Sequence, residues 1–142
     1  MESILPLQSN QVDHIQAIAR DSFPIVWSQK EFLYFLEHPL AVNLGLSAEG
    51  GLQAYFIGLL VRGELDIVSI ATAKAERQKG KAGRLLKYVL DLPKIEQAYL
   101  EVEANNLPAH RLYEKLGFSV TGTRRKYYQH TLDAHLMKWK RS

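Results

Sequence analysis

The chain has 142 residues, enough for one domain with a substantial core but too few for two domains of ordinary size. Hydrophobic residues make up 46% and charged residues 23% of the chain, which excludes a disordered polar protein, and the longest apolar run (54–61) is too short to span a membrane. The absence of cysteine excludes disulfides, a thiolate zinc site and a cysteine nucleophile, and a net charge of +3 does not by itself indicate a nucleic-acid partner.

The predicted elements follow from the spacing of apolar residues, which repeats every three or four positions in helices and alternates or runs continuously in strands. In chain order they are a strand at 2–7, helices at 11–21 and 28–38, strands at 41–47, 52–61 and 64–73, a helix beginning near 81, a strand at 97–104, a helix at 107–116, and strands at 118–128 and 131–139.

Local signals mark where several of these elements begin and end. Ser9 or Asn10 is available as the N-cap of the first helix. The pattern Ser28-Gln-Lys-Glu31 predicts a capping box at the start of the second, and Gly117 is a natural C-cap for the last. Tight turns around residues 49–51 and 62–63 favour an antiparallel meander of three strands.

The order β-α-α-β-β-β-α-β-α-β-β predicts an α+β fold. We expect a mixed, mostly antiparallel sheet of about seven strands, with helices on both faces and a parallel contact where a helix crosses between strands. A single domain over residues 1–142 is expected. The first residues carry no basic segment and do not resemble a signal peptide, so a cytoplasmic protein without membrane association is expected.

The stretch from Glu76 to Leu86 combines small residues and cations directly before an amphipathic helix. Free N–H groups at the start of a helix can bind a phosphate, so the amides of residues 78–83 are candidate ligands of a diphosphate. A plain glycine-containing lead-in to a surface helix is the alternative. Metal binding is not predicted, because the histidines are not grouped at the spacing of metal ligands: His14, His38, His110, His130 and His135.

The pattern Arg77-x-x-Gly80-x-Ala82 resembles the acetyl-CoA loop of the GNAT acetyltransferase superfamily. Downstream, residues 100–106 and 109–118 resemble later GNAT segments in the expected order. The tail from Arg124 to Met137 and the Phe23-Pro24 segment resemble the RimI-type branch, the ribosomal-protein-alanine N-acetyltransferases.

The resemblance implies that acetyl-CoA is the cosubstrate, without a metal. Its pantetheine arm would lie along the end of one strand, with an amide near Ile70 donating to the thioester oxygen. Asn106 would bind the CoA arm or simply cap a helix. The cofactor-binding residues implied are Ile70, Ala71, Thr72, Arg77, Gln78, Lys79, Gly80, Lys81, Ala82, Gly83 and Asn106.

For catalysis, the resemblance implies Glu101 as the general base that takes the proton of the amine, directly or through water. Tyr99 and Glu103 alternate with it on the same strand face and are alternatives. Tyr113 matches the tyrosine that protonates the departing thiolate, although it could also be an aromatic core anchor.

The expected acceptor is a peptide or protein N-terminus, such as the N-terminal alanine of a ribosomal protein. Direct nucleic-acid binding is not required, and the oligomeric state is open. A small amine is the second interpretation, and a non-catalytic ribosome- or RNA-associated module, suggested by the basic run 124–126, is the third. The residues expected to contact the acceptor are Phe23, Trp27, Tyr127, Tyr128 and Asp133.

Overall fold

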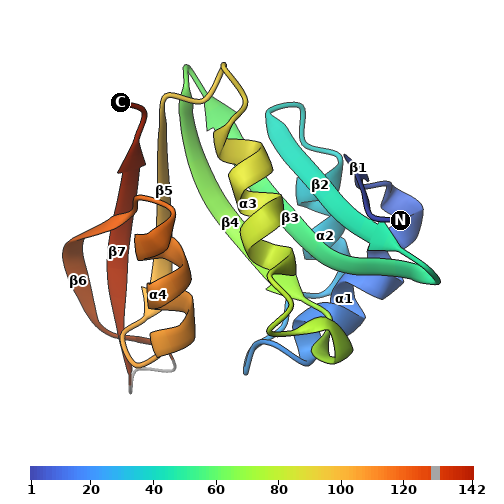
Figure 1. Cartoon of the computed structure of the whole chain (residues 1–142). Coiled ribbons are helices and arrows are strands. Elements are labelled where there is room, and N and C mark those ends of the chain that lie inside the picture. Colours follow the sequence, from blue (N-terminus) through green and yellow to red (C-terminus); the bar gives the residue numbers. More distant parts are fainter. Residues whose placement is uncertain (129–131) are drawn as a thin grey trace.

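The computed structural model describes residues 1–128 and 132–142, apart from the side chains of residues 126–128. Figure 1 shows one sheet with helices on both of its faces. The strands are β1 (Ser3–Pro6), β2 (Ala41–Ala48), β3 (Gly51–Val61), β4 (Glu64–Thr72), β5 (Gln97–Glu103), β6 (Ser119–Tyr128) and β7 (Leu132–Lys140). The helices are α1 (Val12–Arg20), α2 (Gln29–Leu36), α3 (Lys81–Leu90) and α4 (Leu107–Lys115), with short 3-10 helices η1 (Ser9–Gln11) and η2 (Lys74–Glu76).

The predicted order of strands and α-helices is confirmed. The sheet runs β1-β2-β3-β4-β5-β7-β6, and all neighbours are antiparallel except β4 and β5. β2, β3 and β4 form the expected meander, and α3 makes the crossover that leaves β4 and β5 parallel. A parallel pair requires such a crossover because a tight turn can only reverse the chain.

The predicted caps at Ser28 and Gly117 are confirmed, and the second helix ends at Leu36, two residues before the predicted end. Ser28 caps α2 as predicted, accepting from the Glu31 amide at 3.2 Å, while the Glu31 carboxylate accepts from the Ser28 amide at 3.1 Å. Gly117 follows α4 with φ +103°, a conformation that glycine adopts without steric cost.

The predicted N-cap of the first helix is wrong. Ser9 and Asn10 lie inside the 3-10 turn η1, which leads directly into α1. Gln8 precedes that turn, and its amide donates to Gln11 Oε1 at 2.7 Å. The glutamine pair therefore performs the capping that the short polar residues were expected to supply, because the added turn moves them out of the cap position.

Two apolar layers cover the sheet. On one face, α3 and α4 pack on β3, β4 and β5, with Phe56, Leu86 and Leu100 among the buried residues. On the other face, α1 and α2 cover β3 and β4 through residues such as Ile15, Phe32 and Tyr55. Within the described residues, no helix combines the length and apolarity needed to cross a membrane.

Candidate active site

The parallel pair at the centre of the sheet is short. β4 and β5 are paired only from Glu64 to Asp66 on one strand and from Gln97 to Tyr99 on the other, although both strands continue well beyond these residues. Figure 1 shows the two strands separating toward the end of the sheet at which α4 begins. Beyond Asp66, the edge of β4 that faces β5 therefore forms no backbone pairs with β5.

An irregularity in β4 accompanies this separation. Ile57 of β3 pairs with Ser69 and the next residue pairs with Ile67, so Val68 is an extra residue in β4. Such a bulge bends a strand and increases its local twist. The last residues of β4, Ile70 to Thr72, follow the bulge and remain paired with β3, so every second amide among them points away from β3.

The loop between β4 and α3 contains two residues with left-handed backbone. Gln78 (φ +65°) and Gly80 (φ +75°) are both left-handed, and Gly80 is the N-cap of α3 without a side-chain hydrogen bond. The amides of residues 78–83 donate no hydrogen bond to the described residues outside regular helix pairing. These geometric features fit the expected diphosphate site, where the helix dipole would add attraction for an anion.

Gly80→Ala is expected to lower the free energy of unfolding by about 1–2 kcal/mol, because a Cβ disfavours the left-handed conformation. Gln78→Gly is the matched control at the other left-handed position. This substitution relieves backbone strain but increases the conformational entropy lost on folding. The free energy of unfolding should therefore change by less than roughly 1 kcal/mol. Urea unfolding of both variants measures the difference, and equal destabilisation by the two would contradict this account of the loop.

Two basic side chains of the loop have protein partners. Arg77 donates to the backbone carbonyl of Asp21 and to Ser22 Oγ, at the end of α1. Lys79 lies 3.4 Å from the Glu76 carboxylate. Cofactor contact through these side chains stays a prediction, and the backbone amides are the more direct candidates.

The small residues after Gly80 also have packing roles. Gly83 lies against α4, since a Cβ built on it would come within 3.1 Å of Leu112. Ala82, the next residue toward the loop, is partly buried. A larger side chain at position 83 would push α3 and α4 apart, so the glycine has a structural reason that is independent of any ligand.

Glu101 lies two residues beyond the last β5 residue that pairs with β4. It alternates with buried Leu100 and Val102, so it faces away from α3 and α4. Its carboxylate lies 3.0 Å from the Arg124 guanidinium on β6, and its side chain is 30% exposed. Arg124 was not assigned to the site from the sequence, because the two residues meet only through the β5-β7-β6 arrangement.

The two alternatives to Glu101 differ in their surroundings. The Tyr99 hydroxyl donates to Glu64 at 3.1 Å, and burial together with this carboxylate raises the Tyr99 pKa. A hydroxyl that is committed to an acceptor and harder to ionise is a poor base. Glu103 is partly buried on the same face as Glu101 and remains an alternative.

A small cavity of about 180 Å³ opens beside Glu101. Asp66 also lines it, and burial raises the pKa of that carboxyl. Asp66 is thus a second carboxyl at the point where β4 and β5 separate. Sequence reasoning missed it, because only the register of the parallel pair brings it opposite Tyr99. The lining residues are Asp66, Tyr99, Leu100, Glu101, Thr121, Leu136 and Met137.

Tyr113 lies on the other side of the sheet from Glu101. Its ring packs at 5.8 Å from that of Phe118 and against the core beneath α3 and α4. Asn106 is exposed and caps α4, its Oδ1 accepting from the Ala109 amide at 3.3 Å. The capping role of Asn106 is therefore confirmed, and contact with a CoA arm through its amide nitrogen stays a prediction.

The connection between α1 and α2 contains exposed and packed aromatic residues. Phe23 is 38% exposed and the neighbouring Ile25 is 65% exposed. Trp27 is instead stacked on Phe35 at 5.0 Å and packed against the core, which makes it an anchor for the loop. Ile25 was not assigned to the acceptor site from the sequence and is the more accessible apolar residue.

The remaining acceptor candidates lie at the connection between β6 and β7. Asp133 is partly buried, and its backbone carbonyl accepts from the Ala104 amide at 2.8 Å. Tyr127 and Tyr128 end β6, and their side chains lie outside the described residues. In Figure 1 these strand ends and the α1–α2 connection lie at the same end of the sheet.

Two histidines that are distant in sequence come together in the fold. The rings of His110 and His135 lie 4.8 Å apart in an edge-to-face contact, and His110 Nε2 is 3.2 Å from the carbonyl oxygen of Glu103. No group of three His, Asp or Glu side chains suited to a metal occurs in the part of the chain that the structure describes.

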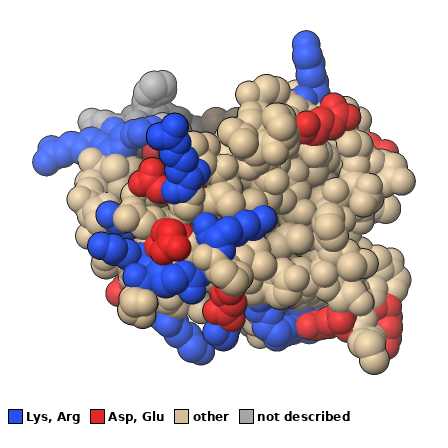
Figure 2. Space-filling model, turned by 90° about the horizontal axis from the view of Figure 1, so that it is seen from above, with Lys and Arg blue, Asp and Glu red and all other residues tan. Residues whose placement is uncertain are grey.

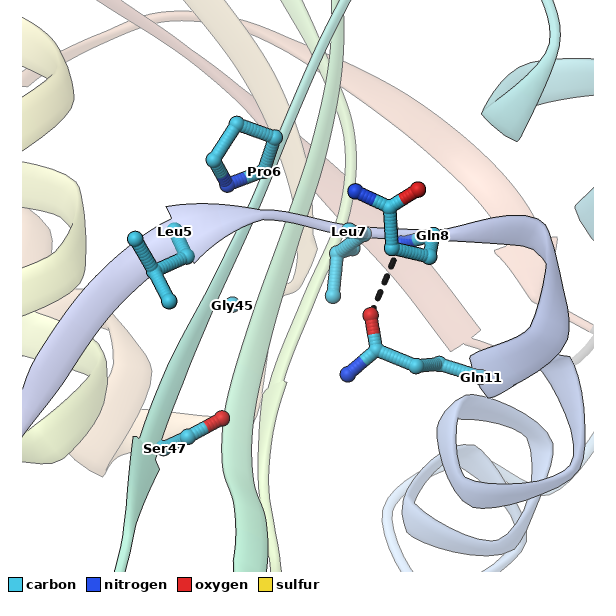
Figure 3. A pocket seen from close by; sticks show the side chains of 7 residues that line it. All are labelled: Leu5, Pro6, Leu7, Gln8, Gln11, Gly45 and Ser47. Atoms are coloured by element: carbon cyan, nitrogen blue, oxygen red, sulfur yellow. Dashed lines mark hydrogen bonds between the residues drawn. The ribbon is translucent and has the colours of Figure 1, made fainter.

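A larger cavity, of about 300 Å³, lies away from Glu101 at the outer edge formed by β1 and β2 (Figure 3). None of its lining side chains is a carboxylate, histidine, lysine or tyrosine, so the Ser47 hydroxyl has no acid or base beside it among them. Glu101 and the smaller cavity are therefore the candidate centre. The residues lining the larger cavity are Leu5, Pro6, Leu7, Gln8, Gln11, Gly45 and Ser47.

The acetyltransferase (GNAT) family model matches residues 12–118, and the chain belongs to this family. It is an N-acetyltransferase, and the predicted GNAT fold is confirmed. The [ribosomal protein bS18]-alanine N-acetyltransferase of Escherichia coli (strain K12) is 30% identical over 134 residues, which cover 92% of this chain and 90% of that protein.

Solved structures agree with this assignment. The crystal structure of the Escherichia coli ribosomal-protein-S18-alanine N-acetyltransferase superposes with a TM-score of 0.91 at 27% identity, covering 99% of this chain and 94% of that one. Arabidopsis thaliana NAA60 in complex with a bisubstrate analogue has a TM-score of 0.87 at 19% identity, covering 99% and 98%, and it shares the fold. The predicted resemblance to the RimI-type branch is confirmed.

Proposed function

We propose that this protein transfers the acetyl group of acetyl-CoA to the free α-amine of a protein N-terminus, most specifically the N-terminal alanine of a ribosomal protein. The observation that carries the chemistry is a carboxylate, Glu101, placed where β4 and β5 separate. The acceptor is supported by the name of the Escherichia coli relative. Such an acceptor is made in the cytoplasm, and one catalytic domain over residues 1–142 suffices for the reaction.

The donor would lie between the two strands. The amides of residues 78–83 would bind its diphosphate, and the outward-facing amides of residues 70–72 would hold the pantetheine arm and thioester oxygen. Both sets of amides are available to a donor, because neither takes part in the hydrogen bonds between β4 and β5. Basic side chains that already have protein partners would add little to this binding.

The acceptor would approach from the face that carries Glu101. Its amine nitrogen attacks the thioester carbonyl carbon, a C–N bond forms and the C–S bond breaks. Glu101 takes the amine proton, directly or through water, and Tyr113 on the opposite side gives a proton to the departing thiolate. An α-amine has a pKa of about 8, so a substantial share is unprotonated near neutral pH and a carboxylate suffices as base.

The exposed Phe23 and Ile25 would contact the residues that follow the acceptor's amine. A non-catalytic RNA-associated role has less support. Arg124, from the basic run that suggested it, is paired with Glu101. In the view of Figure 2, basic and acidic side chains are interspersed, and no broad area of one sign appears on that face.

A peptide panel tests the acceptor. Acetyl transfer to a peptide beginning with the N-terminal sequence of the ribosomal protein, alanine first, should exceed transfer to a panel of free amines and polyamines by at least about 10²-fold in kcat/KM. The same peptide with a blocked N-terminus should not react, which shows that the α-amine is modified. Transfer confined to the free amines would replace the protein acceptor with a small molecule and leave the chemistry unchanged.

A further inference from the structure

A charged cluster joins the first residues of the chain to the start of α3. Lys81, the first residue of α3, is only 8% exposed, and its Nζ donates to Glu2 at 2.7 Å and to Gln53 at 2.6 Å. Arg84 donates to both carboxylate oxygens of Glu2, at 3.0 and 2.7 Å. One carboxylate before β1 therefore binds two cations of α3.

The same cluster holds the loop that precedes α3. The Arg84 guanidinium also donates to the backbone carbonyl of Lys79 at 3.0 Å. The Glu76 carboxylate, at the other end of the loop, lies 3.7 Å from Lys81 Nζ. The backbone from Glu76 to Lys81 contains the two left-handed residues and most of the candidate diphosphate amides.

The charge of Glu2 stabilises this arrangement. A buried ammonium is costly unless it is paired, and the dipole at the start of a helix disfavours a cation there. The hydrogen bonds from Arg84 and then from Lys81 lower the Glu2 pKa to about 2, so the carboxylate stays ionised at neutral pH. Without Glu2, Lys81 would keep Gln53 and the more distant Glu76.

We propose that Glu2 is a positioning residue for donor binding: through Lys81 and Arg84 it holds the loop before α3 in the shape that presents its amides to the diphosphate. It acts on the affinity for acetyl-CoA and leaves the rate of the chemical step unchanged. The proposal rests on the proposed function, since it takes this loop as the diphosphate site. It assigns Lys81 to the protein interior instead of to the phosphate.

Glu2→Gln in the full chain tests the proposal with two acetyl donors. Acetyl-CoA carries the diphosphate, whereas S-acetylpantetheine lacks it. We expect KM for acetyl-CoA, and the dissociation constant of CoA measured by calorimetry, to rise about tenfold, with kcat within about twofold. The kcat/KM for S-acetylpantetheine should stay unchanged. Glu49→Gln, which removes a carboxylate from the exposed β2–β3 turn, is the matched control and should alter neither.

A double variant checks that Glu2 acts through the buried lysine. Lys81→Met removes the ammonium while keeping an unbranched side chain, and in that background Glu2→Gln should raise KM much less than in the wild type. An undiminished effect would overturn the proposal. Equal losses with both donors, or an unchanged KM for acetyl-CoA, would also overturn it. A wild-type protein that does not use acetyl-CoA would instead remove the proposed function itself.

Discussion

Glu101→Gln is expected to lower kcat by about 10²- to 10³-fold while acetyl-CoA binds with unchanged affinity. Glutamine preserves the shape of the side chain and can still accept a hydrogen bond from Arg124, but it cannot take the proton of the amine. The loss should shrink as the pH rises above about 8, since more of the acceptor is then unprotonated. Steady-state kinetics with an alanine-first peptide between pH 6 and 10 measure both effects.

Glu103→Gln is the matched control, because Glu103 lies two residues further along β5 on the same face. We expect its kcat to remain within about threefold of the wild-type value. A larger loss at Glu103 than at Glu101 would move the base to Glu103. Full activity in both variants would show that neither carboxylate takes the proton.

Tyr113→Phe is expected to lower kcat by about 10²-fold, while phenylalanine keeps the ring contact with Phe118. The deficit should depend on the leaving group. With an acetyl thioester of an acidic aryl thiol, whose thiolate departs without a proton, the variant should approach the wild-type rate. Comparing acetyl-CoA with this activated donor therefore separates proton donation from a packing role.

Tyr99→Phe serves as the control for Tyr113. It removes a hydroxyl close to the site that donates to Glu64 instead of facing the reaction. Its kcat should stay within about twofold of the wild-type value with either donor. An equal deficit of Tyr113→Phe with both donors would show that Tyr113 does not protonate the thiolate.

The sequence predicted the parts of the fold that depend on neighbours along the chain. Alternation in β5 placed Tyr99, Glu101 and Glu103 on one face, and the structure has the same pattern. The capping box at Ser28 and the glycine after α4 were also predicted correctly, because each depends on residues within one turn of the helix. The roles of Glu101 and Tyr113 remain predictions, which the experiments above test.

Contacts between distant segments were not predictable in the same way. The Glu101–Arg124 pair depends on β7 lying between β5 and β6, and the Glu2–Lys81 pair joins residues 79 positions apart. A lysine at the start of an amphipathic helix is usually exposed to solvent. Only the position of β1 relative to α3 explains why Lys81 is buried. Charge patterns along a chain do not specify such pairs, since many oppositely charged residues could serve as the partner.

The short pairing of β4 with β5 divides the sheet into two half-sheets, β1 to β4 and β5 to β7 with β6 at the edge. Three residue pairs at one end are the only backbone ladder between the halves in the described part of the chain. A donor that lies in the separation would hydrogen-bond to the outward-facing amides at the end of β4 and so take the place of a paired strand there. Its binding energy would then also stabilise the native arrangement, because a ligand that binds only the folded state favours that state.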